Sequence, residues 1–205
     1  LIGFPGETDD DYRQQIQLIR LLYHLPPPEC VGDLWLERFS PYFTRPEEYG
    51  VTITGPGEAY PYVYDSKDID LFKISYDFEF TTNNQIDPEI RNKLFQTAQE
   101  WKRRHQSDDL PYMMFTKSMN FVTIYDGRSI ESSVKTSFEG PPAWIIVFCN
   151  ESPKTIDQIK KHVLELGAEE ENAAEDAISQ LEKMGILYGE KGKFLTLALP
   201  HNANL

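Results

Sequence analysis

The chain has 205 residues, of which 40% are hydrophobic and 13% aromatic, enough to build one domain or two small ones. Its 33 acidic residues outnumber its 20 basic residues, and the net charge of −13 argues against a nucleic-acid partner, which needs a basic surface. The sequence contains no run of about 18 apolar residues, so it predicts no membrane span. Two cysteines form neither a disulfide framework nor a metal motif, so we expect reduced thiols in a cytoplasmic protein.

The first stretch, Leu1–Thr8, is typical of a buried strand that runs into a tight Gly-Pro-Gly loop. A helix is predicted directly behind the loop, with Thr8 at its N-cap and three aspartates in its first turn. Strand, glycine loop and helix N-terminus is the arrangement by which α/β proteins bring backbone close to a cofactor. The same pattern also occurs in ordinary strand-to-helix turns, because short glycine motifs match by chance.

The predicted helix runs from about Thr8 to His24, with an apolar stripe of Tyr12, Ile16, Ile19 and Tyr23, and Pro26–Pro28 ends it. Residues Asp33 to Phe39 then read as a strand, with Leu34 and Leu36 inward and Phe39 as a third candidate.

Two segments carry a resemblance to a known family. The motif GFPGET, followed by an acidic amphipathic helix, resembles the fifth-strand motif of radical S-adenosylmethionine (SAM) enzymes that have a cobalamin-binding domain. The segments LERFSPYF and RPEEYG, from Leu36 to Gly50, resemble a narrower group, the radical SAM C-methyltransferases that mature ribosomally made peptides such as bacteriocins.

The resemblance implies the cofactor-binding residues. It implies that Gly3, Phe4, Pro5, Gly6 and Glu7 lie beside the adenine of bound SAM. It also makes residues Asp33 to Phe39 the last strand of a partial barrel, which puts Arg38, Ser40 and Tyr42 near the barrel mouth. From the residues alone, Arg38 could equally be an ion-pair partner and Tyr42 a packing residue.

The chain departs from this family in one major respect. The family holds a 4Fe–4S cluster with a CxxxCxxC motif, whereas this chain has only Cys30 and Cys149. A cobalamin domain is absent as well. We therefore expect the C-terminal part of a longer protein, inactive alone, with no catalytic residue, metal ligand or cofactor of its own. Its main partner would be the rest of the parent chain.

By resemblance, the parent cleaves SAM reductively to a 5′-deoxyadenosyl radical, and methylcobalamin delivers a methyl group to a precursor peptide. Two alternatives remain open. One is an oxidative cyclase acting on Mg-protoporphyrin monomethyl ester, or another small-molecule cobalamin-dependent radical SAM enzyme. The other is a non-catalytic peptide-binding or assembly module.

The middle of the chain is predicted to mix helix and strand. Residues 45–61 read as irregular chain, Tyr60, Tyr62 and Tyr64 as a short strand, and Phe72 to Phe80 as another strand. Asp87-Pro88 begins a helix that runs to about Gln106, and its basic last turn, Lys102–Arg104, complements the helix dipole. Two further strands, Tyr112–Phe115 and Met119–Tyr125, lead to a two-residue turn at Asp126-Gly127, and Arg128–Phe138 returns.

The C-terminal segment begins at Gly140-Pro141-Pro142. Residues Trp144 to Cys149 have strand-like composition, but their context favours a helix. Helices are predicted from Thr155 to Leu166 and from Glu170 to Met184, followed by a hairpin from Ile186 to Leu199. Helix, helix, helix, hairpin is the winged-helix order. Residues 150–184 hold nine acidic and four basic residues, so peptide is favoured over DNA as the partner.

These elements predict an α+β chain. Residues 1–58 would form the closing part of a radical SAM barrel, residues 59–140 an α/β connector, and residues 141–205 a winged-helix-like domain.

Overall fold

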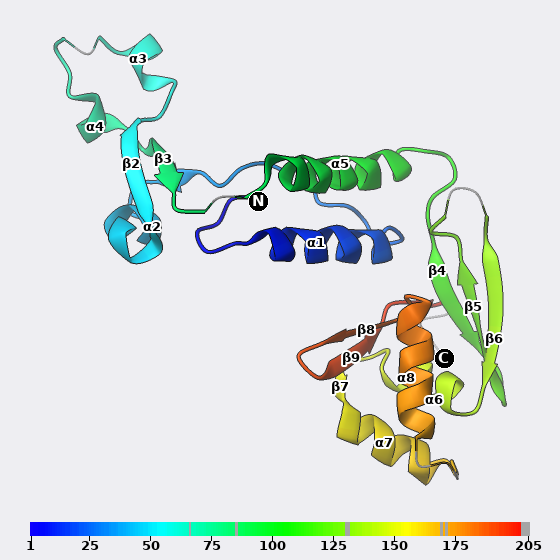
Figure 1. Ribbon diagram of the computed structural model, residues 1–205. Coiled ribbons are helices and arrows are strands. Elements are labelled where there is room, and N and C mark those ends of the chain that lie inside the picture. The colour runs from blue at the N-terminus through cyan, green and yellow to red at the C-terminus, as the bar shows by residue number, and fades with distance from the viewer. Residues whose placement is uncertain (66, 85, 130–131, 169, 171, 202–205) are drawn as a thin grey trace. The chain divides into compact units, whose positions relative to one another are not determined.

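The computed structural model describes residues 1–65, 67–84, 86–129, 132–168, 170 and 172–201. The chain is a mixed α+β protein, as the sequence predicts (Figure 1). It divides into two compact units: unit 1 comprises Leu1–Gln17 and Pro28–Gln99, and unit 2 comprises Leu18–Pro27 and Glu100–Leu205. The predicted three-part division at residues 58 and 140 stays a prediction.

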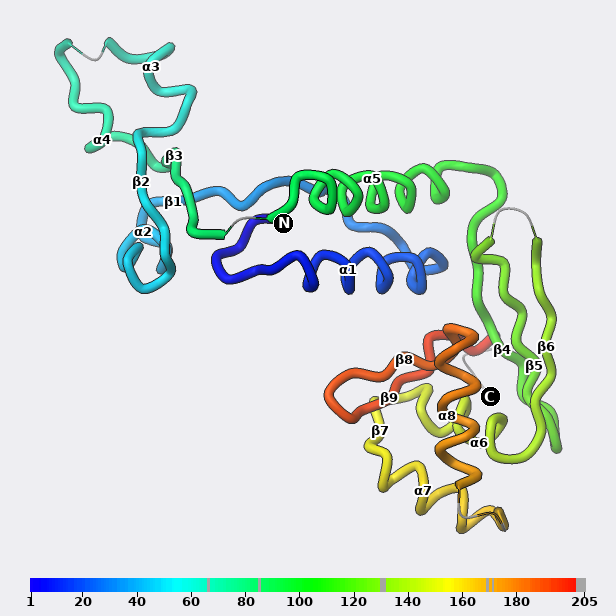
Figure 2. Tube along the Cα trace, viewed as in Figure 1, coloured from blue at the N-terminus to red at the C-terminus, as the bar shows by residue number. Residues whose placement is uncertain are grey.

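Unit 1 opens with a parallel crossover. Ile2 forms a parallel bridge with Asp33, in which the Ile2 N–H donates to Gly32 O over 2.9 Å and the Leu34 N–H donates to Ile2 O over 2.8 Å. Helix α1 (Asp9–Leu21) lies between the two in sequence, and the path can be followed in Figure 2. Its residues Tyr12 and Ile16 are buried, as the predicted stripe requires. The helix ends three residues before the predicted position.

A small antiparallel sheet follows in unit 1. It has the order β1-β3-β2 and consists of β1 (Leu36–Glu37), β2 (Val51–Pro56) and β3 (Asp77–Thr82). Its core is Leu36, Val51 and Phe78. The prediction of irregular chain over residues 45–61 is therefore wrong, because the β-branched residues at the start of β2 pair with β3, and the pairing continues through Gly55 and Pro56 after a register shift that follows Ile53.

Three other predictions for unit 1 need correction. The alternating tyrosines form a helical turn, α3 (Tyr60–Val63), with Pro61 near its start. The predicted strand from Phe72 begins only at Asp77, because Asp70 caps the short helix α4 (Leu71–Ile74) by accepting the Phe72 N–H. Phe39 is 76% exposed and has a φ of 72°, so it faces solvent after β1 has ended. The remaining short elements are α2 (Pro41–Thr44) and the 3-10 helix η1 (Pro46–Tyr49).

Helix α5 (Pro88–Arg104) confirms the predicted start signal. Asp87 Oδ1 accepts the Glu89 N–H over 2.8 Å, and Pro88 is the first helical residue. Its residues Leu94, Ala98 and Trp101 are buried. Near its end, Arg103 and Arg104 both pair with Glu100.

Unit 2 contains a four-stranded sheet of order β10-β4-β5-β6. Its strands are β4 (Met113–Lys117), β5 (Phe121–Asp126), β6 (Val134–Glu139) and β10 (Leu199–Pro200), which runs parallel to β4. The predicted two-residue turn is wrong, because Asp126 pairs with Val134. Arg128 donates its backbone N–H and its guanidinium to the Asp126 carboxylate, which fixes a longer connection. Residues 130 and 131 of that connection lie outside the described residues.

The C-terminal elements follow the predicted order. They are α6 (Pro141–Phe148), β7 (Lys154–Thr155), α7 (Ile156–Glu165), α8 (Ala173–Lys183), β8 (Leu187–Glu190) and β9 (Lys193–Thr196), and the strands form a sheet of order β7-β9-β8. The helical interpretation of Trp144–Cys149 is confirmed over Trp144–Phe148, and Ile145, Ile146 and Cys149 are fully buried. The winged-helix assignment itself stays a prediction.

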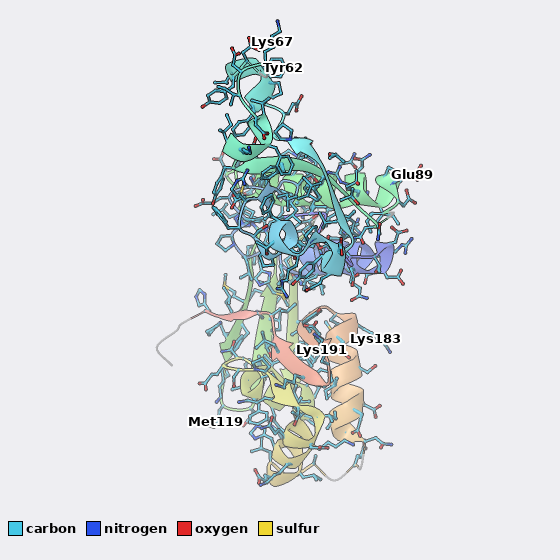
Figure 3. All side chains as sticks on the ribbon, turned by 90° about the vertical axis from the view of Figure 1, so that its left-hand side faces the viewer. Tyr62, Lys67, Glu89, Met119, Lys183 and Lys191 are labelled. Atoms are coloured by element: carbon cyan, nitrogen blue, oxygen red, sulfur yellow. The ribbon has the colours of Figure 1, made fainter. Side chains whose placement is uncertain are left out.

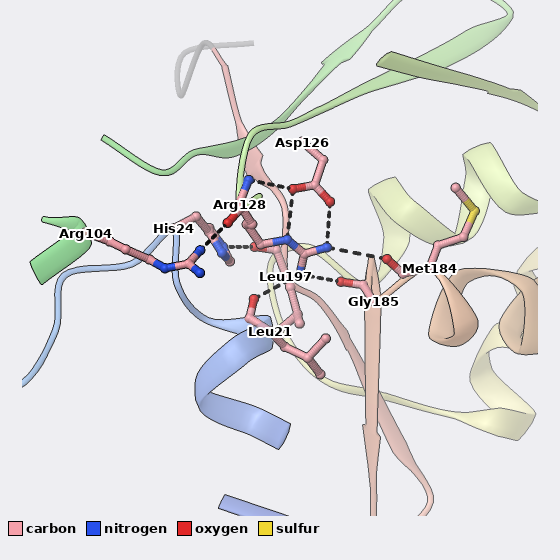
Figure 4. A network of polar contacts seen from close by, with 8 residues as sticks. All are labelled: Leu21, His24, Arg104, Asp126, Arg128, Met184, Gly185 and Leu197. Atoms are coloured by element: carbon pink, nitrogen blue, oxygen red, sulfur yellow. Dashed lines mark hydrogen bonds and ion pairs between the residues drawn. The ribbon is translucent and has the colours of Figure 1, made fainter. Parts of the chain in front are cut away.

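A network of hydrogen bonds connects residues 18–27 to the rest of unit 2 (Figure 4). The Arg128 guanidinium donates to Leu21 O and Gly185 O over 2.9 and 3.0 Å. His24 Nε2 lies 2.9 Å from Leu197 O, and burial lowers the pKa of this imidazole. None of the helices in the described ranges combines the length and the apolar character that crossing a bilayer requires.

Candidate functional site

The glycine loop at the start of unit 1 is a tight turn between the bridge at Ile2 and helix α1. The Glu7 N–H donates to Phe4 O over 3.2 Å, which closes the turn. Gly3 and Gly6 have φ values of +96° and +92°, in the left-handed region that favours glycine. A Cβ built on either glycine would meet nothing within 4 Å, so both backbones border open space. The loop can therefore be approached closely by a ligand.

Glu7 and Tyr12 organise the first half of this loop. Glu7 Oε2 accepts the N–H groups of Gly3 and Phe4 over 3.0 and 2.9 Å, and also the Tyr12 hydroxyl over 3.0 Å. The Tyr12 hydroxyl oxygen in turn accepts the Gly3 N–H over 2.9 Å. Burial, with the Glu7 hydrogen bond and charge, raises the pKa of Tyr12 to about 12. The Glu7 carboxylate is thus engaged by the loop itself.

Asn84 holds the second half of the loop. Its Oδ1 accepts the Gly6 N–H over 3.0 Å, and its Nδ2 donates to Phe4 O over 2.7 Å. One side-chain amide therefore pairs with the loop backbone as a neighbouring strand would. The sequence does not predict this role of Asn84, because a lone asparagine so far along the chain carries no local signal of such a contact.

Helix α1 begins directly after the loop. The Thr8 N–H and hydroxyl donate to Asp11 Oδ2 over 2.8 and 2.7 Å, and the hydrogen bonds from Thr8 lower the pKa of Asp11. The Asp11 N–H donates back to Thr8 Oγ1 over 3.3 Å, which completes a reciprocal cap. The predicted N-cap role of Thr8 is confirmed.

Arg38 is engaged within its own part of unit 1. Its Nε donates to Ser75 O over 2.6 Å, and its guanidinium also donates to Phe72 O. The guanidinium carbon lies 5.2 and 4.9 Å from the ring centroids of Phe43 and Phe78. These contacts tie the residues before β3 to the end of β1, so they agree with a structural role for Arg38.

Ser40 directly precedes the short helix α2, and Tyr42 lies within it. Ser40 is its N-cap, and its Oγ accepts the Phe43 N–H over 3.2 Å. The Tyr42 ring packs edge-on against Tyr49, with centroids 4.8 Å apart, and lies 6.4 Å from the ring of Phe4. Phe4 and Tyr42, one from each group of predicted site residues, are therefore neighbours.

An open groove adjoins the loop. Its volume is about 790 Å³, and Ile2 and Gly3 are part of its lining. The rest comes from residues 33–36, from β3 and from α3 and the residues just before it. It lies entirely within unit 1.

Metal ligands do not gather in the described ranges: no group of three or more His, Cys, Asp or Glu residues there could hold a metal ion. Cys30 is exposed, whereas Cys149 is buried. Burial raises the pKa of the Cys149 thiol to about 12, which keeps it protonated and makes it a poor metal ligand.

Comparison with models of protein families, with curated proteins and with solved structures gives no match. Function is therefore inferred from the motif and from the geometry of the loop that it forms.

Proposed function

We propose that unit 1 supplies the adenosine-binding loop of a cobalamin-dependent radical SAM enzyme, a C-methyltransferase that modifies a ribosomally made peptide. The observation that carries this proposal is the open backbone at Gly3 and Gly6, in the loop of the motif GFPGET that joins the parallel bridge at Ile2 to helix α1. A flat purine can approach such a backbone where any side chain would block it.

The residues around the loop fit an adenosyl group. Glu7, Tyr12 and Asn84 fix the loop backbone before any ligand arrives, which lowers the entropy lost on binding. The rings of Phe4 and Tyr42 supply apolar surface nearby. When bound, SAM provides the adenosyl and methyl groups of the family's chemistry, and this chain's part is to hold the adenosine side.

The residues do not fit the 4Fe–4S cluster. Such a cluster takes thiolate ligands, and of the two cysteines Cys149 is buried and protonated. The cluster ligands and the cobalamin site would belong to other parts of the enzyme. We infer that this chain alone does not cleave SAM.

A substitution at Gly6 tests the adenosine site. We expect titration with 5′-deoxyadenosine to shift the amide NMR signals of residues 3–7, and the variant Gly6→Val to abolish these shifts. Valine at a positive φ is strained by about 1–2 kcal/mol, and its side chain fills the space that the purine would occupy.

The matched control is Gly167→Val. Gly167 also has a φ of +96° and open space around its Cβ, but it follows α7 in unit 2. It should lose similar stability and keep the shifts at residues 3–7. Shifts that survive Gly6→Val would mean that the loop is only a turn.

A second candidate function is peptide binding by the C-terminal elements of unit 2. The order α6, β7, α7, α8, β8, β9 and the sheet order β7-β9-β8 favour a winged-helix-like module. Strand β8 is an edge of that sheet in the described residues, and an extended peptide can add to such an edge through main-chain hydrogen bonds. Helix α8 carries three acidic residues, Glu175, Asp176 and Glu182, and one basic residue, Lys183, and this negative charge disfavours the binding of phosphate groups.

An NMR titration separates the partners of this module. We expect a short peptide of alternating lysine and valine to shift the amide signals of β8 and α8, and duplex DNA to shift neither. No response to peptide, or a response to DNA, would contradict the peptide assignment.

A further inference from the structure

We propose that the groove beside the glycine loop binds a cationic peptide, whose lysine or arginine side chains lie between carboxylates and exposed aromatic rings. The binding argument stands on the groove alone. Its meaning as a substrate site rests on the proposed function, because Gly3 lines the groove and also belongs to the candidate adenosine loop.

The described charged side chains that line the groove are all acidic. Four carboxylates line it, from Asp33, Glu58, Asp77 and Glu79, and none of the described residues that line it is lysine or arginine. Asp33 pairs with Arg91. The other three carboxylates have no ion pair with a basic side chain in the described part of the chain, so their negative charge is available to a partner.

The sheet geometry concentrates this charge on one face. In the register of β1 and β3, Leu36 faces Phe78 in the core, and the neighbouring pair is Glu37 with Asp77. Like charges directly opposite each other on antiparallel strands destabilise a sheet. The alternation along β3 puts Glu79 on the same face as Asp77. A bound cation would relieve this repulsion.

Exposed aromatic side chains complete the surface. Trp35 and Tyr62 line the groove with 73% and 85% of their surface exposed. Figure 3 shows Tyr62 on the turn of α3. Aromatic faces attract ammonium and guanidinium groups, so rings beside carboxylates suit lysine and arginine better than they suit a simple metal cation.

The extent of the surface favours a peptide over a small amine. A second hollow of about 450 Å³ shares Asp33 and Trp35 with the groove and adds Leu1 and Glu37. The two hollows together follow the chain from residue 30 to residue 37. An extended peptide can occupy both, with apolar positions near Leu1 and basic positions near the carboxylates.

Trp35 provides a local readout for the test. Trp101 is 9% exposed and Trp144 is partly buried, so binding at the groove should alter mainly the emission of Trp35. We expect a short peptide of alternating arginine and alanine to change this emission saturably. A glutamate–alanine peptide should have no effect, and the arginine–alanine peptide should lose its effect on Trp35→Leu.

Two variants of equal charge separate the groove from general attraction to an acidic protein. Glu58→Gln/Asp77→Asn/Glu79→Gln should bind the peptide about tenfold more weakly, as expected for the loss of several exposed ion pairs. The control Asp108→Asn/Asp109→Asn/Glu151→Gln removes the same charge in unit 2 and should bind like the original chain. Equal weakening in both variants would overturn the proposal, as would spermine binding as tightly as the peptide.

The peptide groove and the adenosine loop are tested independently of each other. Gly6→Val should leave the Trp35 response intact, because Gly6 does not line the groove. Peptide binding without any response of residues 3–7 to 5′-deoxyadenosine would therefore support the groove and contradict only the cofactor proposal.

Discussion

The loop from Gly3 to Glu7 is held by side chains that reach its backbone from two directions. Glu7 folds back onto the Gly3 and Phe4 N–H groups, and Asn84 reaches in to Gly6 and to Phe4 O. The motif predicts the loop itself, since only its glycines and its cap are needed for that. It does not predict the clamp, because hydrogen bonding between distant residues leaves no periodic or spacing signal.

Removal of the clamp should loosen the loop. We expect Asn84→Ala to lower the free energy of unfolding by about 1–2 kcal/mol, because two hydrogen bonds are lost and the loop is partly exposed. Urea denaturation measures this change, and faster hydrogen exchange of the Gly6 amide would locate it.

The control for that experiment is Asn92→Ala, an exposed asparagine on α5. Its stability should stay within about 0.5 kcal/mol of the original chain. If exchange of the Gly6 amide is the same in the Asn84→Ala variant and in the original chain, the clamp contributes nothing to loop order.

Elements with strong end signals could be predicted from the sequence, and elements that depend on tertiary pairing could not. Asp87-Pro88 and the capping box of Thr155 with Gln158 define the starts of α5 and α7 locally. Helix α6 has strand-like composition, and only its position before two amphipathic helices predicts its type. The two-residue strands β7 and β10 exist only through their partners β9 and β4, so nothing local marks them.

The roles of the candidate site residues likewise depend on contacts that the sequence does not reveal. The rings of Phe4 and Tyr42 lie near each other, whereas Arg38 and Ser40 form contacts within their own segment. The sequence alone does not distinguish an arginine that packs against aromatic rings and backbone carbonyls from an arginine that binds a ligand. Only the positions of Phe72 and Ser75 in space distinguish the two.

At the scale of the whole molecule, the two units have cores of different size. The sheet of unit 1 rests on Leu36, Val51 and Phe78, whereas unit 2 has an extensive core that includes α6, α8 and the inner face of β4 to β6. We expect native-state hydrogen exchange to be faster for the amides of β2 and β3 than for those of α6 and α8, because local stability follows buried apolar contacts. Equal protection in both sets would mean that the chain opens only as one cooperative unit.

The Asn84 clamp also has a consequence for how the protein is made. The loop leaves the ribosome about 80 residues before the amide that pairs with Phe4 O, a separation that takes seconds at about 5–20 residues per second. During that interval Glu7 and Tyr12 can already close the first half of the turn, because both are its near neighbours in sequence. The Gly6 N–H finds its partner only after Asn84 has been synthesised, and contacts between residues so far apart in sequence form slowly. A nascent chain that ends before Asn84 would therefore carry the motif without the assembled loop.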